Sequence, residues 1–290
     1  MPSRRKYQYS RDAAMAKKRN TDDFERMHRS VASQWDDDEV DPEASTYLLA
    51  EPGPDPVPDW VITSDEARQY ELGFLKTGKE ADVHLVERRH GDRVNILAVK
   101  RYRKFEDRMF RNDARYRAGR RTGESRLDKA ISHGNRIGMA FRAQQWLTTE
   151  FEILCRLWSL GAPVPYPVQQ LGNEIMLELI GPPDDTAPRL VNTRPDPDEA
   201  IALWDQLVEA LFTMVGVGVV HGDLSPYNIL VDAGRLVIID FPQAVDPIAN
   251  PDGLSLLQRD VDNVSDWFTR RGVDCRAADL YAQLLTEAMR

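Results

Sequence analysis

The sequence is poor in cysteine and has no long hydrophobic run. Its 290 residues include only Cys155 and Cys275, with neither CxxC spacing nor histidine-rich neighbours, which argues against a zinc site or a disulfide framework and favours a reducing compartment. No apolar run approaches the roughly 18 residues of a membrane-spanning helix, and no apolar stretch follows the basic N-terminus as in a secretory signal. These absences predict a cytoplasmic protein without membrane contact.

The first 60 residues differ in composition from the rest of the chain. Arginine and lysine dominate the beginning, acidic residues reverse the sign between Asp36 and Glu43, and proline then occupies every second position from Pro52 to Pro58. Alternating prolines disfavour a helix and are typical of an extended linker. Residues 1–60 are therefore expected to be a mobile arm, with docking to a partner as the alternative.

The remaining residues predict an α+β fold with two lobes. Residues 61–180 form the expected N-terminal lobe, an antiparallel sheet with one long helix, and residues 181–290 form a mainly helical C-terminal lobe. The expected strands are 71–75, 82–88, 95–102, 165–170, 175–179 and a hairpin of 229–231 and 236–239. The expected helices are 141–160, 197–215 with Asp196 as its N-cap, 254–270 and 276–289.

The strongest chemical signal is the segment His221-Gly222-Asp223-Leu224-Ser225-Pro226-Tyr227-Asn228, followed by the hairpin and Asp240. Phosphoryl transfer depends on positioning and charge neutralisation, so it uses one carboxylate that accepts the proton of the attacking hydroxyl. A second carboxylate and an amide oxygen are suitable ligands for Mg²⁺. These residue types at this spacing therefore predict that Asp223, Asn228 and Asp240 form the site of a phosphotransferase.

Lys100 ends the apolar strand Ile96-Leu97-Ala98-Val99-Lys100 and is the expected partner of the ATP phosphates. A carboxylate on the following helix should hold it, and Glu150 is preferred over Glu152. The loop Lys76-Thr77-Gly78-Lys79-Glu80-Ala81 is the expected phosphate-covering loop, in which Thr77, Gly78 and Lys79 would contact phosphate oxygens. It has one glycine instead of the GxGxxG of ordinary protein kinases, and a plain hairpin turn would also explain it.

These segments together resemble the RIO family of atypical serine/threonine kinases, over residues 70–272. The resemblance favours the bacterial-type branch that lacks a winged-helix domain, although the IDFPQ sequence is similar to the winged-helix branch. The segments that carry it are Thr77-Gly78-Lys79-Glu80-Ala81, Ala98-Val99-Lys100, the segment 221–228, Ile239-Asp240-Phe241-Pro242-Gln243, and Arg259-Asp260-Val261-Asp262-Asn263 with Trp267-Phe268.

The resemblance implies Asp223 as the catalytic aspartate and Asn228 and Asp240 as ligands of Mg²⁺, which Mn²⁺ can replace. It implies ATP between the lobes, with adenine against the backbone of Glu178–Ile180. It also implies a truncated kinase fold without an activation loop or peptide-binding subdomains, which fits autophosphorylation or ATPase activity. Ser125 and Ser132 are the expected autophosphorylation sites, and an aspartyl-phosphate at Asp240 is a further hypothesis.

A basic stretch with interleaved aromatic residues runs from Arg101 to Arg142, within which residues 103–140 are an expected flexible loop. Its composition suits phosphate contacts and base stacking, and relatives act on small ribosomal subunits, so RNA or a ribosomal particle is an expected partner. A solvated loop without a ligand is the alternative. The whole chain carries a net charge of −9, so any polyanion binding would be local.

Two other functions compete with a RIO-type kinase. Small-molecule kinases of the aminoglycoside or choline type carry a similar HGDLxxxN segment, but the sequence lacks their large acidic helical insert after Asp240. An ATP-binding assembly scaffold without catalysis is the second alternative, and the intact set of Lys100, Asp223, Asn228 and Asp240 argues against it. The sequence indicates neither the protein substrate nor the oligomeric state.

Overall fold

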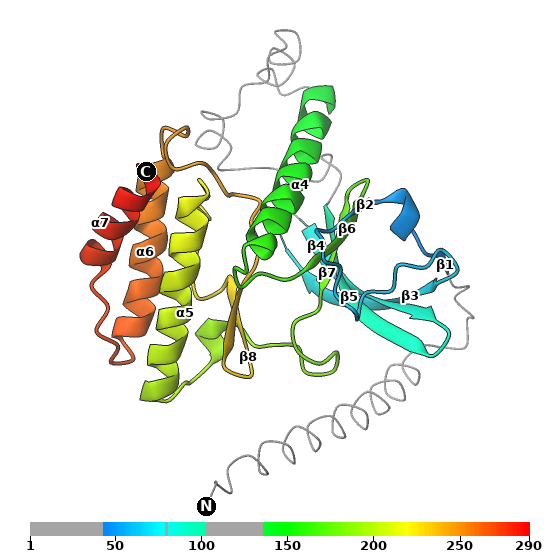
Figure 1. Ribbon diagram of the computed structural model, residues 1–290, viewed down its shortest axis with the longest axis horizontal. Helices are drawn as coiled ribbons and strands as arrows, with labels where there is room; N and C mark the ends of the chain where they lie inside the picture. The colour runs from blue at the N-terminus through cyan, green and yellow to red at the C-terminus, as the bar shows by residue number, and fades with distance from the viewer. Residues whose placement is uncertain (1–42, 79–80, 103–135) are drawn as a thin grey trace, which may run out of the picture.

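Long antiparallel strands form the N-terminal part of the molecule, and helices form the C-terminal part (Figure 1). The computed structural model describes residues 43–78, 81–102 and 136–290, with backbone only for residues 136–147. The strands of the main sheet are β1 Glu43–Ala44, β2 Glu51–Pro52, β3 Arg68–Thr77, β4 Ala81–His90, β5 Arg93–Tyr102, β6 Pro167–Leu171 and β7 Glu174–Glu178.

The seven strands pair antiparallel in the order β1-β3-β4-β5-β7-β6-β2. Strand β5 is the centre of the sheet, and Val99 and Lys100 point to opposite faces because side chains alternate along a strand. The face of Val99 is covered by residues that include Tyr47, Val61 and Tyr166. The face of Lys100 is therefore the one turned toward the rest of the protein.

Residues 43–60 belong to the N-terminal lobe, so the mobile arm predicted for residues 1–60 is wrong over this range. Strand β1 pairs with β3, strand β2 pairs with β6, and the short helix η1 (Tyr47–Leu49) between them buries the ring of Tyr47. Two-residue strands have no alternating pattern that a sequence would reveal. The prolines do extend the chain, and Pro52 lies in an outermost strand, where its missing N–H costs nothing.

Arg88 fastens this N-terminal segment to the sheet. Its guanidinium is fully buried and donates hydrogen bonds to Oε1 of Gln69, Oε1 of Gln169 and the carbonyl of Ile62, at 2.6 to 3.1 Å. It also lies 5.8 Å from the ring centroid of Tyr47. All of these acceptors are neutral, and burial lowers the pKa of Arg88 to about 10.

Helix α4 (Arg136–Ser159) packs against strands β6 and β7 and stands between the sheet and the C-terminal helices (Figure 1). It begins five residues before the predicted start and ends beside the predicted stop. Phe151, Leu154 and Leu157 are buried, at the three-residue spacing that keeps side chains near one helix face. Gly161 ends the helix with φ +76°, a conformation that glycine adopts without strain.

The C-terminal part is built from three helices and a hairpin. Asp196 caps the first helix, as predicted, since its Oδ1 accepts the Glu199 N–H at 2.9 Å. These elements are α5 Pro197–Gly216, α6 Gly253–Thr269, α7 Ala277–Ala288, and the hairpin of β8 Ile229–Asp232 and β9 Arg235–Ile238. Each lies within a few residues of its predicted position.

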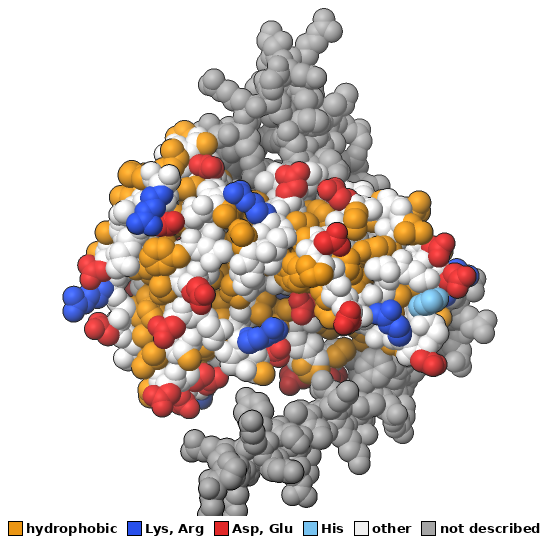
Figure 2. All heavy atoms as spheres, in the orientation of Figure 1, with side chains coloured by type: hydrophobic (Ala, Val, Ile, Leu, Met, Phe, Trp, Pro, Cys, Tyr) orange, Lys and Arg blue, Asp and Glu red, His pale blue; other side chains and the backbone are white. Residues whose placement is uncertain are grey.

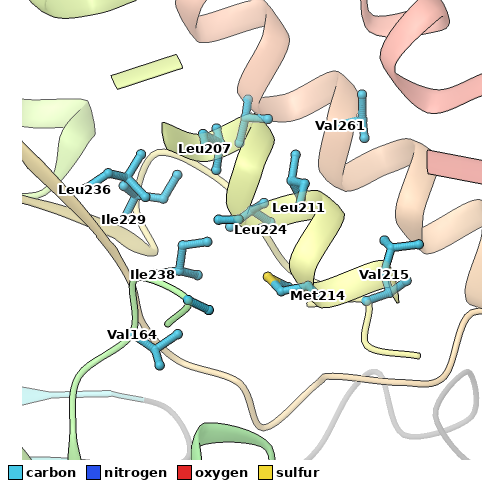
Figure 3. Close-up of a cluster of buried hydrophobic side chains, with 14 of the residues drawn as sticks. Val164, Leu207, Leu211, Met214, Val215, Leu224, Ile229, Leu236, Ile238 and Val261 are labelled. Atoms are coloured by element: carbon cyan, nitrogen blue, oxygen red, sulfur yellow. The ribbon is translucent and has the colours of Figure 1, made fainter. Parts of the chain in front are cut away.

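The C-terminal core joins these helices to the hairpin (Figure 3). Leu224 lies between Leu211 of α5 and the hairpin residues Ile229 and Ile238, and all four side chains are essentially inaccessible to solvent. Since Leu224 directly follows Asp223 in the chain, this packing fixes the position of the loop that carries the strongest chemical signal.

On the face shown in Figure 2, charged side chains of both signs are scattered among apolar ones, without a large patch of one sign. The predicted basic surface of residues 101–142 falls mostly outside the described residues. The predicted serines Ser125 and Ser132 also lie outside them. Within the described part of the chain, no helix is both long and apolar enough to cross a membrane.

Candidate active site

The side chain of Lys100 links the N-terminal sheet to helix α4 and to the C-terminal part. Its Nζ lies 2.7 Å from Oε1 of Glu150 on α4 and 2.6 Å from Oδ1 of Asp240 in the C-terminal part. Lys100 and Glu150 are 8% and 2% exposed, whereas about half of the Asp240 side chain is exposed. The structure thus places Glu150 against the lysine, while Glu152, the second choice, is exposed.

Burial and the neighbouring charges have opposite effects on the pKa values of Lys100 and Glu150. Burial alone would lower the pKa of Lys100, but Glu150 and Asp240 together raise it above its ordinary value. The lysine in turn lowers the pKa of Asp240. Burial raises the pKa of Glu150, and the neighbouring ammonium opposes that shift. Lys100 is therefore a fixed positive charge, and Asp240 is an ionised carboxylate open to solvent on one side.

The hairpin β8–β9 brings Asp223, Asn228 and Asp240 together. The Asn228 side chain donates to the carbonyl of Asp223 at 2.9 Å, and the N–H of Ile239 donates to the carbonyl of Asn228 at 3.0 Å. Asp240 follows with φ +75°, a conformation that is uncommon for a residue other than glycine. Strained backbone of this kind occurs at functional sites. The three residues, five to seventeen positions apart in the chain, thus lie at one end of the hairpin.

Asp260 of α6 anchors the loop that carries Asp223. Its two carboxylate oxygens accept the N–H groups of Gly222 and Leu224 at 2.7 and 2.8 Å, one on each side of Asp223. Arg259 donates to the carbonyl of Gly222, and Asn263 donates to that of Leu224. Burial raises the pKa of Asp260 to about 7 despite the two N–H donors. The sequence analysis noted this segment but assigned no role to Asp260.

Gly222 and His221 complete the anchoring of this loop. Gly222 has φ +79°, and a Cβ on it would lie 2.5 Å from the carbonyl oxygen of Gln243, so no larger residue fits. The Nδ1 of His221 accepts the N–H of Asp223 at 3.3 Å, which leaves Nε2 to donate to the carbonyl of Ile239 at 3.1 Å. Burial lowers the pKa of His221 to about 4, so the ring is neutral.

The predicted phosphate loop is a turn between β3 and β4. Thr77 is exposed, and the N–H of Gly78 donates to the carbonyl of Ala81 at 2.9 Å. Lys79, the third residue predicted to contact phosphate, lies outside the described residues. The predicted loop therefore precedes β4, whose Val83 pairs with Lys100, but its role in phosphate binding stays a prediction.

The segment predicted to contact adenine connects β7 to the C-terminal part. Ile180 is buried against Ala187 and Val237, and its carbonyl accepts the N–H of Ala187. The side chain of Glu178 faces away from such a contact, because its Oε2 accepts the N–H of Tyr166 at 3.0 Å. Contact of adenine with the backbone of Glu178–Ile180 stays a prediction.

The donor atoms at the end of the hairpin fit Mg²⁺. Because the amide nitrogen of Asn228 donates to a carbonyl, its oxygen is the atom that remains for a cation, at the same end of the hairpin as Asp240. Both are hard oxygen donors, and Mg²⁺ commonly takes few protein ligands together with phosphate oxygens and water. Among the described residues, no cluster of three or more His, Cys, Asp and Glu side chains offers a metal site.

An antiparallel sheet with a buried Lys–Glu pair, joined to a helical part in which an Asp–Asn–Asp set flanks a β-hairpin, defines a protein-kinase-like fold. The sequence profile of the RIO domain matches residues 82–280. The chain belongs to the RIO family of atypical serine/threonine kinases, which use ATP. This membership decides against the aminoglycoside and choline kinase alternative.

Several relatives are Rio1 proteins. The Rio1 kinase of Haloferax volcanii is 35% identical over 209 residues, which cover 72% of this chain and 67% of the relative. RIO1 of Chaetomium thermophilum is 35% identical over 70% of this chain, and human RIO1 is 31% identical over 69%. The matches cover only 40% and 34% of these two eukaryotic proteins, which are much longer than the shared region.

A solved structure has a similar fold. The Rio2 kinase of Chaetomium thermophilum, determined as an ADP/Mg²⁺–phosphoaspartate complex, matches with a TM-score of 0.50 and 22% sequence identity. The match covers 71% of this chain and 59% of the Rio2 chain. At this identity the likeness concerns the fold: an antiparallel N-terminal sheet followed by a helical C-terminal part.

Proposed function

We propose that the chain transfers the γ-phosphate of ATP to a serine or threonine hydroxyl, on itself or on a protein partner, at a site formed by Lys100, Asp223, Asn228 and Asp240. The observation that carries the proposal is the contact of Lys100 with both Glu150 and Asp240, at 2.7 and 2.6 Å. A buried cation between the two lobes, next to an ionised aspartate, suits the phosphates of a nucleotide.

Each residue has one role in the proposed reaction. Lys100 binds the α- and β-phosphates while Glu150 holds it in place. The carboxylate of Asp223, which is exposed, accepts the proton of the attacking hydroxyl; the hydroxyl oxygen bonds to the γ-phosphorus as the bond to ADP breaks. Asn228 and Asp240 hold Mg²⁺, or Mn²⁺ in its place. The metal supplies neutralisation of the phosphate charge.

The short connection after Asp240 limits the kinds of substrate that the site would accept. Only residues 241–252 connect Asp240 to the start of α6, which leaves little chain for an activation loop or a peptide-binding subdomain. Autophosphorylation at Ser125 or Ser132, or ATP hydrolysis coupled to a bound partner, fits such a site better than broad peptide phosphorylation. A cytoplasmic location and RNA or ribosomal contact through residues 101–142 remain proposals from the sequence.

An aspartyl-phosphate is a second form of the product. Asp240 is ionised beside Lys100, and its half-exposed carboxylate is a suitable nucleophile for the γ-phosphorus. The carboxylate oxygen would bond to phosphorus as ADP leaves, and water would later hydrolyse the acyl phosphate.

The test is transfer of ³²P from γ-labelled ATP with Mg²⁺ to the protein, to a generic protein substrate and to an aminoglycoside. Wild type is compared with Asp223→Asn, Asp240→Asn and the control Asp266→Asn, an exposed aspartate on α6. We expect label on protein that is lost in the first two variants and retained in the control. Acid-stable label located by mass spectrometry indicates phosphoserine, and label released by hydroxylamine indicates the aspartyl-phosphate.

Three results would contradict the proposal. Label on the aminoglycoside alone would identify a small-molecule kinase. Phosphate release that persists in Asp223→Asn and Asp240→Asn would place the chemistry elsewhere. ATP binding without transfer or hydrolysis by wild type would leave the assembly scaffold.

A further inference from the structure

The ring of Tyr102 lies beside the ammonium of Lys100. The two residues are two positions apart on β5, so their side chains share the face of the sheet that meets α4. Nζ of Lys100 is 5.2 Å from the ring centroid of Tyr102, within the roughly 6 Å over which a ring attracts a cation. Tyr102 is 3% exposed and Lys100 is 8% exposed, so water screens this attraction little.

Packing on three elements fixes the ring. Tyr102 forms a buried cluster with Ala81 at the start of β4, Phe151 of α4 and Ile175 of β7. Ala81 is its cross-strand partner and is the last residue of the predicted phosphate loop, and Phe151 directly follows Glu150. Asn173 holds the backbone, because its carbonyl accepts the Tyr102 N–H at 3.0 Å and its side chain donates to the Tyr102 carbonyl at 2.8 Å.

We propose that Tyr102 is a positioning residue that holds the Lys100 ammonium in place when the nucleotide binds. The inference rests on the proposed function. Before nucleotide binds, two carboxylates fix the ammonium. Binding of Mg²⁺ by Asp240 would withdraw one of these carboxylates, whereas the attraction of the ring face for the ammonium would be unchanged. The ring also keeps water from that side, which strengthens the attraction between the ammonium and the phosphates.

A purely structural role for Tyr102 makes a different prediction. In that case only the volume of the side chain matters, and any loss of activity follows loss of stability. The chain offers a matched control, since the ring of Tyr47 lies 5.8 Å from the buried guanidinium of Arg88 on the opposite face of the same sheet. Replacing Tyr47 removes a buried ring and a cation contact without touching Lys100.

The experiment measures the Kd for ATP with Mg²⁺ together with KM and kcat for full-length wild type, Tyr102→Phe, Tyr102→Leu and Tyr47→Leu. We expect Tyr102→Phe to stay within about twofold of wild type and Tyr102→Leu to raise Kd and KM for ATP about tenfold, with a smaller change in kcat. Tyr47→Leu should lower thermal stability without a comparable change in Kd. In case Tyr102→Leu does not fold, phenylalanines with one to four ring fluorines at position 102 preserve the shape and progressively weaken the ring's negative face, so Kd should rise with each fluorine.

A Kd that is constant across the fluorinated series, or that rises as much in Tyr47→Leu as in Tyr102→Leu, would overturn the inference and leave the proposed function intact. Failure of the wild type to bind ATP would overturn the proposed function, and this inference with it. Loss of affinity in Tyr102→Phe equal to that in Tyr102→Leu would assign the effect to the hydroxyl and also contradict the role of the ring.

Discussion

The backbone N–H of Phe241 donates a hydrogen bond of 3.1 Å to Oε1 of Glu150, ninety-one positions earlier in the chain. The same oxygen accepts a hydrogen bond from the ammonium group of Lys100. Helix α4 is thereby tied to the residue that follows Asp240, so a displacement of the helix moves both the lysine and the metal-binding segment. The geometry of the active site therefore depends on the position of α4.

Replacing only one member of the Lys100–Glu150 pair should lower the stability of the folded protein. Lys100→Met leaves a buried carboxylate without its cation, and we expect it to lower the free energy of unfolding by about 3 kcal/mol. Lys100→Met with Glu150→Gln should recover most of that loss. Urea unfolding of the single and double variants measures this coupling. Glu152→Gln is the control, because this glutamate on the same helix is exposed. Additive losses in the double variant would show that the two side chains act independently.

His221 should make the folded state sensitive to acid. Its pKa is about 4 when folded, below the ordinary value of 6.5, so the unfolded chain binds the proton more readily. The stability it contributes is complete above about pH 6.5 and is lost as pH falls toward 4, by about 3 kcal/mol. We expect the difference in stability between wild type and His221→Gln to shrink over this range in urea unfolding. The exposed His90, changed to Gln, is the control. An NMR titration of His221 centred near pH 6.5 would contradict the prediction.

Asp260 should affect catalysis without touching the substrate. Asp260→Asn places an amide group against one of the two backbone N–H groups beside Asp223, and leaves that donor unsatisfied at a cost of about 1–3 kcal/mol. We expect kcat to fall tenfold or more. The Kd for ATP should change little, because Lys100 and Asp240 are unaffected. Asp262→Asn, an exposed neighbour on α6, should behave as wild type. A change in Kd with an unchanged kcat would be evidence against this anchoring role.

Arg88 should matter for stability alone. Arg88→Met removes the cation but leaves the oxygens of Gln69, Gln169 and Ile62 without donors, so we expect a loss of about 3 kcal/mol in thermal or urea unfolding. Arg88→Lys should not restore it, since an ammonium lacks the planar fork that reaches three acceptors. Arg93→Lys is a partly matched control. Arg93 lies at the start of β5 and also donates to a backbone carbonyl, that of Val61, but in a more exposed position. Full stability of Arg88→Lys would mean that charge alone suffices.

Elements with a strong local signal could be predicted from the sequence. Helix α5 carries its cap at Asp196 and its buried positions at helical spacing, and it was predicted to within one residue at its end. Lys100 could be predicted because it follows the apolar run Ile96–Val99, and Asp240 because of its spacing from Asp223 and Asn228. The family resemblance joined these local signals into one site, and the family match confirms that resemblance.

Features that depend on distant parts of the chain were missed. Strands β1 and β2 are two residues long, and only pairing with β3 and β6 makes them strands. Arg88 looks like an ordinary charged residue of a strand until three neutral acceptors surround it. Asp260 lies in a recognisable segment, but its partners are two backbone N–H groups, which leave no mark in a sequence.

The segment of residues 43–62 places a short strand at each border of the sheet, with β1 outermost on one side and β2 on the other. Strand borders are where sheets of separate molecules join during aggregation, and very short edge strands hinder that association, as does the proline of β2. A chain cut to begin at Trp60 would uncover β3 and β6 together. Such a chain would retain every residue of the proposed reaction and yet be prone to associate with its own copies, so the segment protects the solubility of the lobe.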